Sequence, residues 1–130
     1  MLEIACLLSV ALLFGGMLLF SAGFAAALFS ALPIDMARRT LRHTFPHFYL
    51  YVIANAGLAA LLAWPRDTLS ALLLALIALT TLPTRQVLMP AINAATDAGQ
   101  HGRFKWLHGL SVLVTLAHIA LAGVVLARFV

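Results

Sequence analysis

Charge, cysteine and catalytic motifs are all scarce in this chain of 130 residues. Charged residues make up 9%, whereas a soluble domain has about 25%. Four acids and eight bases do not supply the polar surface that a water-soluble fold or a disordered tail requires. Cys6 is the only cysteine, so an intrachain disulfide and a CxxC metal motif are both excluded.

The absence of known sequence motifs also argues against an enzyme and against a nucleic-acid-binding protein. The sequence contains no GxSxG, phosphate-binding-loop or HExxH pattern. Four carboxylates are too few for a calcium site built from protein alone. No basic stripe carries interleaved aromatic residues, so we expect no nucleic-acid partner. A non-enzymatic role is favoured over an enzyme.

Apolar residues, in contrast, make up 64% of the chain. A helix that spans a bilayer needs about 20 mainly apolar residues. Four segments meet this requirement, at about residues 4–29, 46–64, 68–90 and 106–129. Because lipid cannot satisfy backbone groups, each segment must be a helix. We therefore predict an all-α fold, an integral membrane four-helix bundle forming one transmembrane domain over residues 1–130. The first segment is too long for a signal peptide and lacks its basic start, so we expect it to be retained.

The connection between the first two segments is amphipathic. Apolar positions from Ile34 to Phe45 alternate with Arg38, Arg39 and Arg42. This pattern predicts a short interfacial amphipathic segment, with these arginines and Lys105 at lipid headgroups. Pro46 is suited to the first turn of the second span.

Basic residues also predict the orientation. The first and third connections share one face of the membrane and carry most of the bases, so they should be cytoplasmic. We expect a multi-pass protein of the bacterial inner (cytoplasmic) membrane, with both termini periplasmic. The bases of those two connections are Arg38, Arg39, Arg42, Arg103 and Lys105, and those of the other face are Arg66 and Arg128.

Two polar residues fall near the middle of the predicted spans. His118 lies about 20 Å past Lys105, and Asn55 about 14 Å past Pro46 on the same side, at 1.5 Å per residue. Polar groups at this depth are costly and need a partner or a purpose. A neutral His118 bonded to Asn55 or to a backbone carbonyl, a haem or metal ligand, and a proton relay all remain open.

The cytoplasmic ends of the last two spans carry further candidates. Arg85 lies between two prolines, where it either anchors the helix or contacts an anion such as a haem propionate. His108 belongs either to a hydrogen-bond network with Arg85, Asn93 and Asp97 or to a binding site.

His43 and His47 have the spacing of two metal ligands on one helix face. Pro46 disfavours a helical Phe45, so we expect that the two histidines do not share a continuous helix. A metal site built from this pair is therefore weakly supported, and interfacial histidines among aromatic residues are the stronger interpretation.

Small residues recur along three of the spans and let helix backbones approach closely. Ordinary packing within the bundle and a homodimer seam both explain them. They are most frequent at Gly15–Gly16, Ser21–Ala27, Ala56–Ala63 and Ala120–Ala127.

The chain resembles the family of small membrane proteins called domain of unknown function 4149. The resemblance implies a four-helix membrane protein with no established catalytic activity. It also implies a link to metals, since eukaryotic relatives are associated with tolerance of metal-containing drugs and distantly similar bundles handle copper or haem. The residues that carry it are Leu32-Pro33, Phe45-Pro46-x-Phe48-Tyr49, Leu88-Met89-Pro90-Ala91-Ile92-Asn93, Asp97, Phe104 and His108-Gly109-Leu110-Ser111.

The leading hypothesis is a small inner-membrane protein that binds or hands on haem b or copper between its helices. His108 and His118 are the candidate ligands, with Arg85 and Asn55 beside the cofactor. An alternative is a non-catalytic accessory or structural subunit that packs onto a larger membrane complex or another copy of itself. A small oligomeric transporter is the third hypothesis, suggested by the prolines of the third span.

Overall fold

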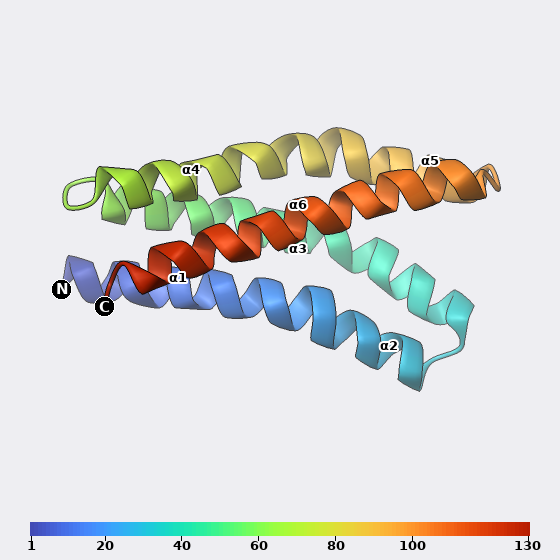
Figure 1. Ribbon diagram of the computed structural model, residues 1–130. Coiled ribbons are helices and arrows are strands. Elements are labelled where there is room, and N and C mark those ends of the chain that lie inside the picture. The colour runs from blue at the N-terminus through green and yellow to red at the C-terminus, as the bar shows by residue number, and fades with distance from the viewer.

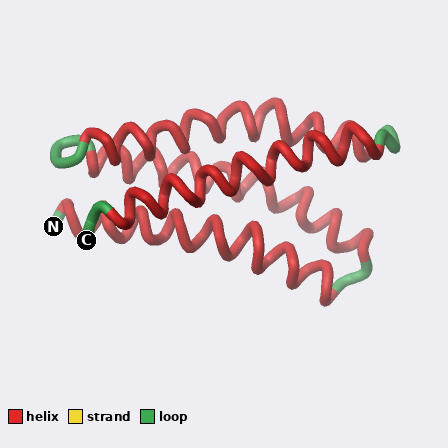
Figure 2. The backbone as a smooth tube through the Cα atoms, viewed as in Figure 1, coloured by secondary structure: helices red, strands yellow, loops and turns green.

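The computed structural model describes residues 1–130 as four long helices packed side by side (Figure 1). Each is long and apolar enough to cross a membrane, and no strand occurs (Figure 2). The predicted all-α membrane bundle is confirmed. The elements are α1 (Leu2–Leu18), the π-helical η1 (Leu19–Phe24), α2 (Ala25–Ala31), α3 (Ile34–Ala63), α4 (Thr68–Pro83), the π-helical η2 (Thr84–Leu88), α5 (Met89–Asp97) and α6 (His101–Ala127).

Helix α3 differs from the sequence prediction. The predicted interfacial segment is not separate from the second span, because the helix runs unbroken from Ile34 to Ala63 with Pro46 inside it. Proline removes one backbone hydrogen bond, but Ala37 and Leu41 before it are buried, as is Phe48 after it. Packing on both sides of Pro46 favours one continuous helix. Similarly, α6 begins at His101 rather than near Trp106.

The packed core lies toward the end of the bundle that holds both termini. In Figure 1 the two termini and the α3–α4 connection share one end, and the other two connections share the opposite end. Met17 is the last buried residue of the first helix, and no residue of η1 or α2 is buried. Beyond that point, α2 with the start of α3 diverges from α5 with the start of α6 (Figure 1).

One ion pair joins the diverging pairs of helices. Both guanidinium nitrogens Nη1 and Nη2 of Arg42 on α3 donate to the carboxylate of Asp97 on α5, each at 2.7 Å. This bidentate geometry is the strongest form of an arginine–carboxylate contact. Arg42, which we expected at lipid headgroups, therefore also has a partner within the chain.

One helix contact depends on glycine. A Cβ added at Gly16 would overlap the ring of Tyr51, whereas one added at Gly123 would make an ordinary van der Waals contact with Cε2 of Phe14 at 3.4 Å. The Tyr51 hydroxyl on α3 donates to the Leu12 carbonyl of α1 at 2.5 Å. The contact between Gly16 and Tyr51 accounts for the close approach of α1 to α3.

Candidate intramembrane site around His118

Threonine hydroxyls follow one another along α4 and η2 near the centre of the bundle. Thr80 donates to the Leu76 carbonyl at 2.6 Å, Thr81 to the Ile77 carbonyl at 2.6 Å, and Thr84 to the Thr80 carbonyl at 2.9 Å. Such bonds to a carbonyl one turn back satisfy the hydroxyl within its own helix. A row of polar oxygen atoms is thereby held inside an apolar bundle.

The helix that carries these threonines is irregular for an identifiable reason. Pro83 and Pro90 flank η2, and neither can donate to the carbonyl four residues before it. The wider π-helical turn lies between them. Segments of this kind occur frequently at functional sites.

His118 faces this row from α6. Its side chain is 7% exposed, and its Nε2 lies 2.7 Å from Oγ1 of Thr80. The hydrogen bond to Asn55 that the sequence suggested does not form, because Asn55 Nδ2 donates to the Tyr51 hydroxyl one turn away at 3.4 Å. Thr80 is the partner that sequence reasoning missed.

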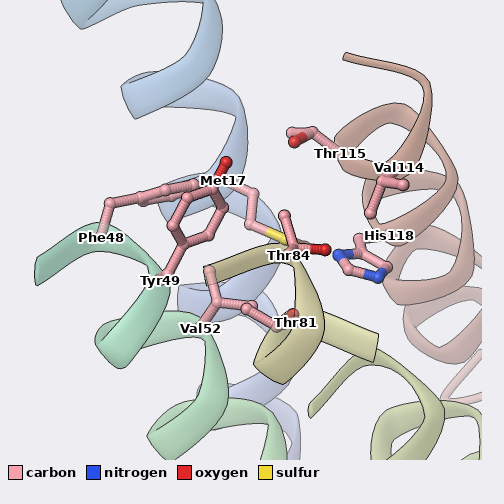
Figure 3. Close-up of a pocket in the computed structure, with 9 residues that line it drawn as sticks. All are labelled: Met17, Phe48, Tyr49, Val52, Thr81, Thr84, Val114, Thr115 and His118. Carbon is pink, nitrogen blue, oxygen red and sulfur yellow. The ribbon is translucent and has the colours of Figure 1, made fainter. Parts of the chain in front are cut away.

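A cavity of about 10 Å³ lies beside His118 where the four helices meet (Figure 3). A space of this size holds about one water molecule. The sulfur of Met17 and the imidazole of His118 lie on either side of Thr84 in Figure 3. The cavity is lined by Met17, Phe48, Tyr49, Val52, Thr81, Thr84, Val114, Thr115 and His118.

The chemistry of this lining is unusual for a hydrophobic core. Met17 is 1% exposed and contributes a thioether, His118 contributes an imidazole, and the threonines contribute hydroxyl groups. No carboxylate or thiol lines the cavity. Haem does not fit, because pockets for ligands of drug size or larger measure about 300–1,000 Å³.

The other candidate ligand, His108, lies apart from His118. The two are ten residues apart on α6, or about 15 Å along the axis, so they cannot bind one ion together. The His108 ring is exposed and stacks on Phe104 with a centroid distance of 5.3 Å. The network expected around His108 is also not formed: Arg85 Nε donates to the Pro46 carbonyl at 3.1 Å, and Asp97 pairs with Arg42.

His43 and His47 share the continuous helix α3, contrary to the expectation that Pro46 separates them. Their exposed rings have centroids 6.0 Å apart. No group of three or more histidine, cysteine or acidic side chains that could hold a metal ion is present in the chain. Arg38, Arg39 and Lys105 are exposed at the same end of the bundle, where contact with lipid headgroups stays a prediction.

Comparison with known proteins identifies the family. The family model described as domain of unknown function (DUF4149) matches residues 8–101, which run from within α1 to the first residue of α6 and make up more than half of the chain. No curated protein and no solved structure matches the chain. Cavity residues Met17, Phe48 and Thr84 fall inside the matched region, whereas His118 follows it. The chain belongs to the DUF4149 family.

Proposed function

We propose that this membrane protein binds a monovalent soft transition-metal ion, copper in its +1 state, in the cavity between Met17 and His118. The observation that carries the proposal is the cavity of about 10 Å³, which is large enough for a single ion and has a thioether and an imidazole in its wall. Thioether sulfur favours copper(I), and neutral imidazole is a common copper ligand. Bound there, the ion would be surrounded by side chains from all four helices.

The absence of an anionic side chain from the cavity favours a monovalent over a divalent ion. Burying a charge in an apolar environment is costly unless an opposite charge is present. The lining residues are all neutral or, for His118, titratable to a cation. Threonine hydroxyl dipoles can compensate part of the cost for a single charge, whereas the cost of burying two charges without an anionic ligand is larger.

Metal binding can be tested with silver(I), which mimics copper(I) and does not oxidise. We expect purified protein in detergent to bind one ion in equilibrium dialysis with elemental analysis. Met17→Leu and His118→Gln should each weaken binding by about tenfold or more, since each removes a ligand atom. X-ray absorption on the loaded protein should detect sulfur scattering that Met17→Leu abolishes.

Matched controls separate ligand loss from loss of folding. Met89→Leu changes a partly buried methionine that does not line the cavity, and His108→Gln changes an exposed histidine on the same helix as His118. Both should retain the affinity of the unchanged protein. Binding that is absent, or that survives loss of Met17 and of His118, would refute the proposal.

We also propose that the arginine-bearing connections face the cytoplasm of a bacterium and that both termini are periplasmic, as the positive-inside rule predicts. Cys6 is buried, so the unchanged protein should give little background in thiol labelling. Gln100→Cys, between α5 and α6, should label only from the cytoplasmic side. Thr68→Cys, at the start of α4, should label only from outside, and reversed labelling would overturn the orientation.

A second candidate function is that of a subunit packing sideways against a partner helix. Gly15 on α1 is exposed, and no atom lies within 4 Å of a Cβ added there. Packing within the chain therefore does not explain this glycine, although it explains Gly16. Co-purification with a partner in mild detergent that Gly15→Leu abolishes would support this role. Retention of the same partner by Gly15→Leu would count against it.

A further inference from the structure

A second and larger cleft lies at the end of the bundle that holds the termini. Its volume is about 400 Å³, and all four helices contribute to it, directly or through the residues next to their ends. Leu62 and Phe129 supply apolar walls, whereas Arg66, Asp67 and Arg128 supply charge. Trp64 next to this region is 59% exposed, as is typical of residues at a membrane–water interface.

One ion pair in the cleft is fixed firmly in place. Arg128 donates through Nε and Nη2 to the Asp67 carboxylate at 2.8 and 2.9 Å. Asp67 also accepts from the backbone N–H of Ser70 at 3.1 Å and so caps α4. The hydrogen bonds from Arg128, and to a lesser extent those from Ser70, hold the pKa of Asp67 well below its usual range. The carboxylate is therefore ionised under all physiological conditions.

The second ion pair leaves most of its hydrogen-bonding capacity free. Arg66 Nη1 lies 2.8 Å from Oε2 of Glu3, and both side chains are 58% exposed. A guanidinium has five N–H donors, and the Arg66 side chain forms no other hydrogen bond or ion pair within the chain. Nη1 of Arg128 is likewise without a partner. Two guanidinium groups with free donors thus line one cleft, an arrangement suited to a phosphate.

The charges of the cleft balance. Two arginines face Glu3 and Asp67, so a purely anionic ligand meets two carboxylates as well as two cations. A ligand that carries both a phosphate and an ammonium group satisfies both sets, with its ammonium at the exposed carboxylate of Glu3. The apolar walls at Leu62 and Phe129 offer a surface for acyl chains.

We propose that this cleft binds a phosphate ester bearing an ammonium group, as in the headgroup of phosphatidylethanolamine. The phosphate contacts Arg66 and Arg128, and the ammonium contacts Glu3. The same chemistry occurs in free phosphoethanolamine, which would enter the cleft from water rather than from the bilayer. The site is independent of the cavity at His118.

Native mass spectrometry of the delipidated full chain can test this proposal. Protein titrated with phosphatidylethanolamine should retain several-fold more lipid than protein titrated with phosphatidylglycerol, which lacks the ammonium. Arg66→Gln should reduce retention of both lipids, and Glu3→Gln should abolish the preference between them. Arg103→Gln, an exposed arginine at the opposite end of the bundle, is the matched control and should change neither.

Competition distinguishes the two sources of the ligand. If millimolar phosphoethanolamine displaces the lipid, the headgroup alone is sufficient for binding. If phosphoethanolamine does not displace the lipid, the acyl chains also contribute to binding. Circular dichroism and thermal melting check that each variant is folded. Equal retention of the two lipids by the unchanged protein, or folded Arg66→Gln that retains both lipids undiminished, would overturn the proposal.

Discussion

Replacing Gly16 by alanine tests how closely α1 and α3 approach. The added Cβ would lie 2.9 Å from Cε1 and Cζ of Tyr51 and closer still to its hydroxyl oxygen. The ring cannot withdraw without losing its hydrogen bond to the Leu12 carbonyl. Overpacking costs about 1–3 kcal/mol and the lost bond about 1 kcal/mol, offset by about 1 kcal/mol from the better helix propensity of alanine. We expect Gly16→Ala to lower the free energy of unfolding by about 1–3 kcal/mol.

The neighbouring glycine provides the matched control. No atom lies within 4 Å of a Cβ at Gly15, so Gly15→Ala should stabilise the protein by up to about 1 kcal/mol. Reversible unfolding in mixed detergent micelles measures both variants. Combining Gly16→Ala with Tyr51→Phe removes the closest contact, so the double variant should lose less stability than the sum of the two single changes. If Gly15→Ala and Gly16→Ala shifted stability in the same direction, the reasoning would be wrong.

Two further predictions concern hydrogen bonds. Thr80→Val removes the partner of His118 Nε2, so the nitrogen NMR spectrum of His118 should change from that of one tautomer to that of a mixture. Thr80→Ser keeps the hydroxyl and should retain one tautomer. An unchanged spectrum in Thr80→Val would show that another group orients the ring. For Asp67, whose pKa the Arg128 and Ser70 contacts lower, stabilisation is fully present above the ordinary value of about 3.9 and is lost as pH falls toward the lowered one. The difference in melting temperature between the unchanged protein and Asp67→Asn should therefore stay constant from pH 8 to about 4 and shrink only in stronger acid. A difference that vanished near pH 6 would contradict this assignment.

The four helices could be predicted because their cause is simple and local. Lipid requires about 20 apolar residues in helical form per crossing, and composition shows where they lie. The continuity of α3 could also have been predicted from its spacing. Its buried positions Ala37, Leu41, Phe48, Val52 and Ala56 are four or seven residues apart, so one apolar stripe continues through Pro46. The expectation that Pro46 interrupts the helix considered that residue alone. It did not take account of the apolar periodicity on both sides of Pro46, which extends over about five turns.

The partner of His118 could not be predicted in the same way. The rise per residue gives the expected depth of a side chain along its span, and the depth of His118 in the bilayer stays a prediction. Which neighbour it meets depends on the rotation of α6 and on which helices adjoin it. Asn55 was expected at a similar depth, but its amide bonds to Tyr51 on its own helix, and Thr80 faces His118 instead.

Met17 was missed for a different reason. Methionine fills irregular gaps in many cores, so a methionine in an apolar span carries no signal of its own. Of the four methionines in the chain, only Met17 lines the cavity. Its position in the cavity wall follows from tertiary packing alone.

The position of the cavity predicts the side from which a bound ion would exchange. Met17 is the last buried residue of the first helix, and Thr84 is the only buried residue of η2, so the cavity lies where the tightly packed half of the bundle ends. On one side, Leu13, Leu74 and Ile77 are completely buried and close the way to the termini. On the other side the helix pairs diverge (Figure 1). If an ion binds at His118 as we propose, we expect it to exchange past the Arg42–Asp97 pair, so substitution of Arg42 should alter the exchange rate of bound silver more than its affinity.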